Sequence, residues 1–396
     1  MTEPWRKSDV FNSNQPCMHA LVIGTSYYTY LPQNPGDPPP DGVRETLGLG
    51  QATTPASSAL TFARWLESDY YNPDAPMGSI RLLVSPSQEE KDQHTALANS
   101  ESTVLNANTN NVKSALRAWK QDCERNRDNV AVFFVSGHGV NITKDDSIVL
   151  LEDFGNPVEN ILGCAMDIGG IWRGMSNNRA AKTQFYFVDA CRIKPSAFKK
   201  YEHTPAGVTL DSEETTKVEA APIYYAAAPS SFALGEPGRG TLFCQALLDC
   251  FKLHGVEAPD SNGRWVVTTS SLKNALEQRV SAIAESHDEE QVFDSGGRMR
   301  NRIFHVLREP PYVPLHISLI PENASQFAKA KLWDGYEPNN VIFDEAQFTP
   351  SLDTQIPGGL WVLSISIPND VSDYQSKDSL PVAAFPPDGW SKEIKV

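Results

Sequence analysis

The sequence comprises 396 residues with a net charge of −15 at pH 7, of which 40% are hydrophobic and 21% charged. This length allows roughly two or three domains, and the composition is that of an ordinary globular protein. The acidic balance, with no dense Lys/Arg stripe, argues against nucleic acid as a partner. No run approaches the roughly 20 apolar residues of a membrane-spanning helix, and Met1–Pro16 lacks the apolar core of a signal peptide. We therefore expect a cytoplasmic protein with no membrane partner, whose six cysteines stay reduced.

Apolar strands alternate with amphipathic helices through the first half of the chain. Continuous apolar runs predict buried strands, and apolar residues three or four positions apart predict helices. In chain order we expect a strand at 19–28, a helix at 55–69, a strand at 79–84, a polar loop at 85–102, a helix around 112–123, a strand ending at His138, a short strand at 147–151, a helix at 166–175 and a strand ending at Cys191. Helices between buried strands predict an α/β fold with a mostly parallel sheet covered on both faces.

Two of these strands end in reactive side chains. Segment 132–139 reads Val-Phe-Phe-Val-Ser-Gly-His-Gly, and segment 185–191 reads Phe-Tyr-Phe-Val-Asp-Ala-Cys. In such sheets the ligand site lies beyond the carboxyl ends of the strands, which is where we expect His138 and Cys191. We interpret the pair as the base and nucleophile of a cysteine protease, because an imidazole can take a thiol proton and later protonate the leaving amine.

The backbone around this pair fits the same chemistry. Gly137 and Gly139 leave room for a substrate carbonyl, and the N–H groups of Gly139 and Cys191 are candidate donors to an oxyanion. The structural alternative is that Cys191 is a small buried hydrophobe and His138 a turn residue, which is the usual role of a lone Cys or His.

The second half of the chain continues the strands and helices up to about residue 303 and then changes to a β-rich pattern. After a polar segment at 192–219 we expect a strand at 221–228 and helices at 240–253 and 270–285. Short strand-like runs between Pro, Gly and Asp turns then predict a small β-rich domain, a sandwich. The predicted divisions are an N-terminal tail at 1–16, an α/β domain at 17–305 and a β-rich domain at 306–396.

Three motifs together resemble the caspase-like cysteine peptidases, which include caspases, metacaspases and bacterial relatives. Ser136-Gly-His-Gly and Asp189-Ala-Cys resemble the His and Cys motifs, with the His roughly 50 residues before the Cys. Segment 224–234 resembles the substrate-binding wall of caspases, and the segment from Gly240 resembles the helix after it. The resemblance covers about 17–300 and implies a caspase-like sheet sandwiched by helices and a His138/Cys191 endopeptidase. It also implies substrate contacts from Ala227, Ala228, Pro229 and Ser230.

Asp189 departs from the caspase pattern. Caspases hold the Asp of their substrate with arginines and a Gln two residues before the nucleophile, but that position here is Asp189, and no cation stands near Gly235. A buried carboxylate repels another carboxylate and attracts Arg or Lys. Metacaspases, which cut after Arg or Lys, are similar in having Asp there. We therefore expect protein substrates cut after Arg or Lys, with Arg favoured by bidentate pairing; the alternative is that Asp189 merely caps local backbone.

The resemblance also implies synthesis as a zymogen. Segment 192–219 lies where caspases carry their processed linker, and polar exposed segments are common nicking sites. Self-cleavage is one route; cleavage by a separate upstream protease and an ordinary unprocessed loop are the alternatives. The candidate cleavage residues are Arg192, Lys194, Lys199, Lys200 and Lys217.

No cofactor is expected, although calcium, which metacaspases often need, is left undecided. Asp145, Asp146, Glu152 and Asp153 lie near the His strand, but the chain has no EF-hand spacing and no Cys-x-x-Cys zinc pair. By family analogy the endopeptidase would act in a regulated defence or cell-death type of pathway. Two functions compete with it: a non-catalytic scaffold with a caspase-like fold, and another use of the thiol such as acyl transfer. The presence of both His138 and Cys191 weighs against the scaffold.

Overall fold

The structure is a computed structural model of the chain. It describes residues 3–12, 14–43, 46–98, 104–141, 147–158, 160–177, 179–194, 201, 204–211, 218–369, 371 and 373–396. The chain divides into two compact units. Unit 1 comprises Met1–Leu248 and Lys273–His305, and unit 2 comprises Asp249–Leu272 and Val306–Val396. Segment 249–272, which the sequence places in the predicted 17–305 domain, therefore groups with the C-terminal strands.

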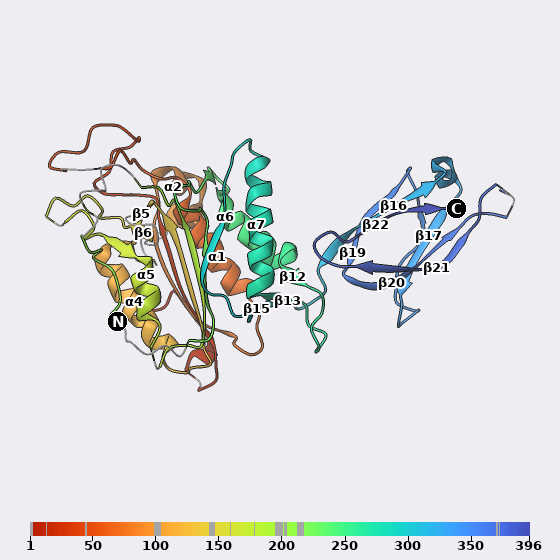
Figure 1. The fold of residues 1–396 in the computed structure, drawn as a ribbon, viewed down its shortest axis with the longest axis horizontal. Helices are drawn as coiled ribbons and strands as arrows, with labels where there is room; N and C mark the ends of the chain where they lie inside the picture. Colours follow the sequence, from red (N-terminus) through yellow and green to blue (C-terminus); the bar gives the residue numbers. More distant parts are fainter. Residues whose placement is uncertain are drawn as a thin grey trace. The chain divides into compact units, whose positions relative to one another are not determined.

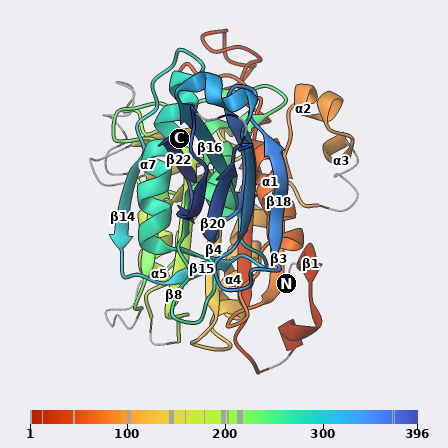
Figure 2. The ribbon, with the colours of Figure 1, turned by 90° about the vertical axis from the view of Figure 1, so that its right-hand side faces the viewer.

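A seven-stranded sheet forms the centre of unit 1, in the order β1-β3-β2-β4-β8-β9-β14. Its five inner strands are parallel, and the edge strands β1 and β14 pair antiparallel to β3 and β9. Figure 2 shows β14 and β1 on opposite edges of this sheet. The strands span Arg6–Lys7 (β1), Met18–Thr25 (β2), Met77–Ser85 (β3), Val130–Gly137 (β4), Thr183–Ala190 (β8), Ala221–Tyr225 (β9) and Asp294–Arg298 (β14). The predicted mostly parallel sheet is confirmed.

Helices cover both faces of this sheet (Figure 1). On one face, Trp119 of α4 (Thr109–Cys123) and Ile171 of α5 (Ile168–Gly174) pack into a core that includes Phe133 of β4. On the other face, Phe62 of α1 (Pro55–Ser68) stacks on Phe134 with ring centroids 4.6 Å apart. Adjacent residues of β4 thus point to opposite cores, which explains why its sequence is apolar throughout rather than alternating.

The remaining elements of unit 1 include two helices that the sequence analysis missed. The loop predicted at 85–102 contains α2 (Gln88–Gln93) and α3 (Thr95–Ala98). Ser87 and Glu90 form a reciprocal capping box that starts α2, a pattern visible in the sequence. The predicted strand at 147–151 is β6 (Ser147–Leu150), which joins β5 (Gly139–Asn141) and β7 (Ala165–Asp167) in a separate small sheet. The other elements are η1 (Asp9–Asn12), β10 (Gly235–Glu236), β11 (Gly240–Thr241), α6 (Leu242–Asp249) and α7 (Thr269–Glu285).

Unit 2 is built around two β-sheets that share one apolar core. One sheet has the order β19-β16-β22 and the other β18-β17-β20-β21. Leu315 of β16 and Leu363 of β20 are both buried in the shared core, so the predicted β-rich C-terminal region is confirmed. The elements are a π-helical turn at Cys250–His254, β12 (Val256–Glu257), β13 (Val266–Thr268), β16 (Tyr312–Ile320), η5 (Glu322–Gln326), β17 (Lys329–Asp334), β18 (Val341–Gln347), β19 (Leu352–Pro357), β20 (Gly359–Ser366), β21 (Lys377–Ala384) and β22 (Trp390–Lys395), with β15 at Ile303–Val306 between the units in sequence.

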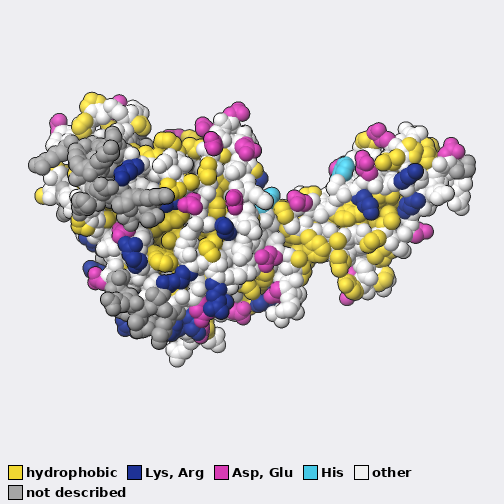
Figure 3. All heavy atoms as spheres, viewed as in Figure 1, with side chains coloured by type: hydrophobic (Ala, Val, Ile, Leu, Met, Phe, Trp, Pro, Cys, Tyr) yellow, Lys and Arg dark blue, Asp and Glu magenta, His cyan; other side chains and the backbone are white. Residues whose placement is uncertain are grey.

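The charged side chains on the surface are mixed in sign. On the face shown in Figure 3, Lys and Arg side chains are interspersed with Asp and Glu. Among the described residues, no helix has both the length and the apolar character needed to cross a membrane.

Candidate active site

His138 and Cys191 lie at corresponding positions just beyond two neighbouring parallel strands. In the register of β4 and β8, Gly137 pairs with Ala190, and past the strand ends Val140 bridges to Ile193. His138 and Cys191 fall between these two pairings. The two buried apolar runs therefore bring the imidazole and the thiol to the same edge of the sheet, as the sequence predicts.

Three contacts fix His138, one to its backbone and two to its ring. Its backbone N–H donates to the Tyr28 hydroxyl at 2.8 Å, and its ring stacks on the Tyr28 ring with centroids 5.0 Å apart. Its Nε2 lies 2.8 Å from the carbonyl oxygen of Gly50. A carbonyl only accepts hydrogen bonds, so Nε2 carries the proton and Nδ1 is the free basic nitrogen. Burial lowers the pKa of His138, partly opposed by the Gly50 hydrogen bond.

Tyr28 is itself fixed by buried contacts. It is fully buried, and its hydroxyl donates to the carbonyl of Thr25 at 3.1 Å. The side-chain amide of Gln51 accepts from the Tyr28 N–H at 2.7 Å and donates to the Tyr28 carbonyl at 2.9 Å. No motif in the sequence marks Tyr28, Gly50 or Gln51, because they lie about 90 to 110 positions before the histidine they support.

Cys191 is partly exposed and contacts a folded-back loop. The N–H of Ala233 donates to its Sγ at 3.2 Å, and its S–H donates to the Ala233 carbonyl at 3.6 Å. Burial raises the pKa of the Cys191 thiol; the Ala233 hydrogen bond opposes this effect, and the nearby Asp189 adds to it. With the histidine pKa lowered and the thiol pKa raised, both side chains are neutral at pH 7 in this state.

Gly139 approaches the nucleophile too closely for any other residue. A Cβ on Gly139 would lie 2.2 Å from the Cys191 carbonyl oxygen and 2.7 Å from the Ala190 Cβ. The N–H of Leu150 donates to the carbonyl of His138. Hydrogen-bonded and non-hydrogen-bonded pairs alternate along antiparallel strands, so the next pair, Gly139 and Val149, exchanges no backbone hydrogen bonds. The Gly139 N–H therefore points away from β6.

Asp189 is a buried carboxylate with one unsatisfied oxygen. It is 2% exposed, and its Oδ2 accepts hydrogen bonds from the hydroxyls of Ser136 at 2.9 Å and Thr241 at 2.5 Å. Its Oδ1 is buried and has no hydrogen-bond partner. Burial raises the pKa of Asp189 to about 7, against the lowering effect of the two hydroxyls. Both partners are side chains, so Oδ2 does not cap local backbone.

The wall residues lie on a loop beside the nucleophile. Ala227 is buried, Ala228 is partly buried, and Pro229 and Ser230 are exposed. Ser230 donates its N–H to the carbonyl of Arg192 at 2.8 Å. The strand predicted at 221–228 ends at Tyr225, and the chain from Ala226 onward forms this loop.

Arg192 does not lie in an exposed linker, contrary to the expectation for a cleavage site. It is 4% exposed, its guanidinium pairs with Asp294 at 2.6 Å, and it lies 4.2 Å over the Tyr225 ring. Arg192 is thus a buried anchor next to the nucleophile. Lys194 is exposed, whereas Lys199, Lys200 and Lys217 lie outside the described residues.

The described residues contain no group of three or more His, Cys, Asp or Glu that could hold a metal ion. Glu152 and Asp153 instead accept hydrogen bonds from Ser85 at 2.5 Å and from Thr109 at 2.8 Å. Asp145 and Asp146 lie outside the described residues.

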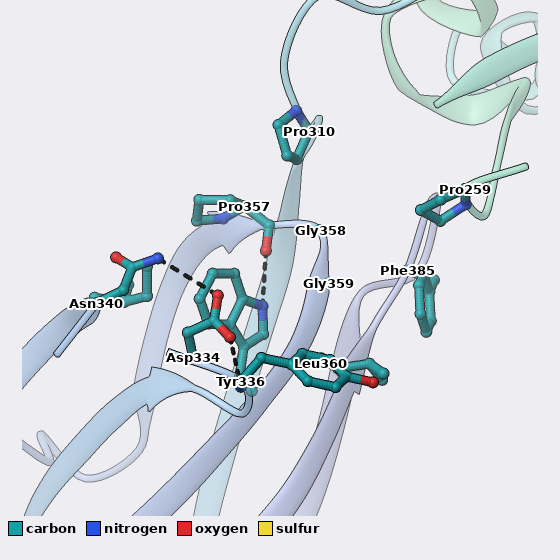
Figure 4. Close-up of a pocket in the computed structure, with 12 residues that line it drawn as sticks. Pro259, Pro310, Asp334, Tyr336, Asn340, Pro357, Gly358, Gly359, Leu360 and Phe385 are labelled. Carbon is teal, nitrogen blue, oxygen red and sulfur yellow. Dashed lines mark hydrogen bonds between the residues drawn. The ribbon is translucent and has the colours of Figure 1, made fainter. Parts of the chain in front are cut away.

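A pocket of about 590 Å³ lies in unit 2 (Figure 4). Its lining is mostly apolar, and its carboxylate, Asp334, accepts hydrogen bonds from the N–H groups of Tyr336 and Glu337 in its own turn. Tyr336 is 82% exposed, whereas Trp361 is buried in the core of unit 2. The lining residues are Pro259, Pro310, Asp334, Tyr336, Asn340, Ile342, Pro357, Gly358, Gly359, Leu360, Trp361 and Phe385.

Comparison with protein families decides the identity of unit 1. The caspase domain family matches residues 59–292, which is more than half of the chain and includes His138 and Cys191. The chain belongs to the caspase domain family. Its mixed central sheet with helices on both faces is the caspase-like fold, and membership supports a protease-type function.

Individual relatives are distant. An uncharacterized protein, y4kE, from Sinorhizobium fredii (strain NBRC 101917 / NGR234) is 24% identical over 296 residues, which cover 73% of this chain and 80% of that protein. The crystal structure of caspase-1 from Spodoptera frugiperda matches with 13% identity and a TM-score of 0.43, covering 78% of this chain and 98% of that chain.

Proposed function

We propose that the protein is a cysteine endopeptidase with His138 as base and Cys191 as nucleophile. The observation that carries the proposal is the register of β4 and β8, which aligns both residues beyond the carboxyl ends of adjacent strands. The Gly50 carbonyl adds support, because it occupies Nε2 and leaves Nδ1 as the basic nitrogen.

The reaction would follow the thiol protease sequence. His138 takes the proton of the Cys191 thiol, and the thiolate attacks the scissile carbonyl carbon to form a tetrahedral oxyanion. The N–H groups of Gly139 and Cys191 donate to that oxyanion. Protonated His138 then gives its proton to the leaving amine, which leaves a thioester. Water, deprotonated by His138, releases the carboxylic acid and restores the thiol.

The resting dyad is a neutral pair, so proton transfer would accompany substrate binding. The lowered pKa of His138 and the raised pKa of Cys191 both disfavour the ion pair in the closed state. Polarisation by a bound substrate would lower the cost of the thiolate, and the Ala233 N–H, which donates to Sγ, would stabilise it. The substrate would thus take part in activating its own nucleophile.

Asp189 would select a cation in the substrate, so that cleavage follows Arg or Lys. Support comes from Oδ1, which is buried without a hydrogen-bond donor. An Arg guanidinium supplies an N–H donor for this oxygen and a full charge, and it would also lower the raised pKa of this carboxyl. Oδ1 is closed to solvent in this conformation, so access for the guanidinium requires local movement.

By family analogy the activity would be limited proteolysis of protein partners in a regulated defence or cell-death type of pathway. Among the candidate processing sites within the described residues, Lys194 is the exposed one and Arg192 is not. Because Pro195 follows Lys194, the bond after Lys194 is a Lys–Pro bond, which endopeptidases cut poorly. Processing by the protein itself or by an upstream protease is therefore proposed at Lys199, Lys200 or Lys217.

An affinity probe with an arginyl chloromethylketone group tests this function. Wild-type protein should be labelled at Cys191, and Cys191→Ala should not be labelled at any other cysteine, since the other five are buried. The matched probe with an aspartyl group should react at least about tenfold more slowly, because Asp189 repels it. Equal labelling by both probes would overturn the specificity, and no labelling by either would favour a non-catalytic scaffold.

A further inference from the structure

One buried glutamine joins both ends of the loop that contacts Cys191. The loop runs from Ala226 to Leu234 and is called here the wall loop. Gln291 accepts the Leu234 N–H at its Oε1 at 2.9 Å, and its Nε2 donates to the Ala226 carbonyl at 2.9 Å. Gln291 is 2% exposed, so water cannot replace either bond when the loop is closed.

The middle of the wall loop is fixed to the nucleophile strand. The N–H of Arg192 donates to the carbonyl of Ser231 at 3.0 Å, and the N–H of Ser230 donates back to Arg192. Further along the loop, Ala233 places its N–H on the Cys191 Sγ at 3.2 Å. The loop is therefore closed around the thiol by backbone contacts in its middle. At its two ends Gln291 acts together with backbone bonds from the Ala226 N–H to the Val188 carbonyl and from the Leu242 N–H to the Leu234 carbonyl.

A primary amide is suited to this double contact. It presents one donor and one acceptor at fixed geometry, whereas an apolar side chain presents neither and a carboxylate presents acceptors alone. We propose that Gln291 is the positioning residue that holds the wall loop closed on Cys191. Its effect on peptide cleavage rests on the proposed function, whereas its effect on the thiol does not.

Loss of this clamp has two separable consequences. Without Gln291 the Ala226 carbonyl and the Leu234 N–H have no partner in the closed loop, which favours the open loop. Opening removes the Ala233 N–H from Sγ, which raises the thiol pKa, but it also relieves the burial that is the larger cause of the raised pKa. Small reagents therefore reach the thiol faster. The same opening disorders the wall that peptide substrates contact, so substrate binding weakens.

Alkylation of Gln291→Leu by iodoacetamide, mapped by peptide mass spectrometry, tests the clamp without peptidase activity. Cys191 should react about tenfold faster than in wild type, as expected from two lost buried hydrogen bonds. The five buried cysteines report unfolding in the same sample and should remain slow. An unchanged Cys191 rate, or faster reaction of all six cysteines together, would overturn the proposal.

Gln184→Leu is the matched control. Gln184 is 1% exposed and also donates to two carbonyls, those of Met175 at 2.9 Å and Ala181 at 3.0 Å, but it lies at the start of β8. Gln184→Leu should lower the melting temperature as much as Gln291→Leu does, but it should leave the Cys191 alkylation rate at the wild-type value. A rise in Cys191 reactivity equal to that of Gln291→Leu would show that general destabilisation is the cause and would overturn the clamp.

Gln291→Glu adds a second measurement, the pH dependence of Cys191 alkylation, which would not change if Gln291 only stabilised the fold. The ionised carboxylate of this variant still accepts from Leu234 but repels the Ala226 carbonyl, whereas the protonated acid donates to it, and burial raises the pKa of such a carboxyl. The ratio of variant to wild-type alkylation rates should therefore fall towards one as pH decreases. A ratio independent of pH would contradict the donor role of Nε2.

Peptide kinetics then separate this inference from the proposed function. With an arginyl peptide, Gln291→Leu should raise KM about tenfold with a smaller change in kcat, since the wall contacts substrate and the dyad is untouched. If wild type cleaves no peptide while alkylation behaves as expected, the proposed function fails and the clamp stands. If wild type cleaves and Gln291→Leu leaves KM unchanged, the role of the clamp in substrate binding is overturned.

Discussion

The hydroxyl of Tyr28 accepts a hydrogen bond from the backbone N–H of His138 at 2.8 Å, while the two rings stack at 5.0 Å. A single buried phenol thus fixes both the backbone and the ring plane of the proposed base. Its hydroxyl proton is directed to the Thr25 carbonyl at the end of β2, so the position of the base is tied to a neighbouring strand of the sheet.

Tyr28→Phe should lower kcat about tenfold with little change in KM. The variant keeps the stacked ring but leaves the buried N–H of His138 without an acceptor, which costs about 1–3 kcal/mol. Steady-state kinetics on an arginyl peptide measures the effect. Tyr70→Phe is the control, because Tyr70 is a buried tyrosine that donates to the Ala75 carbonyl away from the site. An equal loss of kcat in both variants would contradict the role given to Tyr28.

Asp189→Asn should stabilise the fold above pH 7. The folded pKa of Asp189 is about 7, above its ordinary value of 3.8, so the folded state binds the proton more tightly than the unfolded state. The contribution of Asp189 to stability is therefore greatest below pH 3.8 and falls as pH rises towards 7, by on the order of a few kcal/mol when the shift is converted to free energy. Melting temperatures of wild type and variant, measured from about pH 5 to 8.5, should diverge as pH rises; parallel curves would refute the shift.

The same substitution should remove the preference for a cationic substrate. In wild type, kcat/KM for an arginyl peptide should rise through about pH 7 as Asp189 ionises, because only the carboxylate attracts the guanidinium. Asp189→Asn should lose that rise and cut arginyl and glutaminyl peptides at similar rates. An arginyl preference that survived in Asp189→Asn would place the specificity elsewhere.

Gly139→Ala should reduce activity by about a hundredfold or more. Its Cβ would overlap the Cys191 carbonyl oxygen, so the two strand ends must separate and the oxyanion donors lose their alignment. Gly296→Ala is the matched control, since a Cβ there would meet the Tyr225 ring at an ordinary 3.9 Å. Hydrolysis rates normalised to folded protein provide the measurement, and full activity in Gly139→Ala would count against the proposed oxyanion site.

Native trypsin digestion should leave the Arg192–Ile193 bond intact. Arg192 is buried and its carbonyl accepts from Ser230, and the bond after the exposed Lys194 is a Lys–Pro bond that trypsin does not cut. Intact-mass analysis identifies the fragments, and digestion of the denatured chain should show the cut after Arg192. A native fragment that begins at Ile193 would contradict the burial of this anchor.

The sequence was sufficient to predict that His138 and Cys191 lie at the same edge of the sheet, but not which residues support them. His138 and Cys191 each follow a long apolar run. These runs are easy to recognise as strands in the sequence, because both faces of each strand are buried. The strand β14 carries Gly296 and Gly297 and has no apolar pattern, so it was missed. Gly50, Ala233 and Gln291 act through contacts between chain segments that are distant in sequence. Such contacts depend on the finished fold and leave no local pattern.

The clamp by Gln291 has a consequence for the order in which the site is assembled. The ribosome synthesises the chain from the N-terminus at roughly 5–20 residues per second, so Gln291 emerges on the order of ten seconds after Cys191. During that interval the parallel strands that carry the dyad can pair, but the wall loop lacks its Gln291 contacts at both ends. A chain that stalls before Gln291 would therefore carry a reactive thiol without a formed substrate wall. During synthesis, the reactive thiol is therefore present before the wall loop that would select its substrates is held in place.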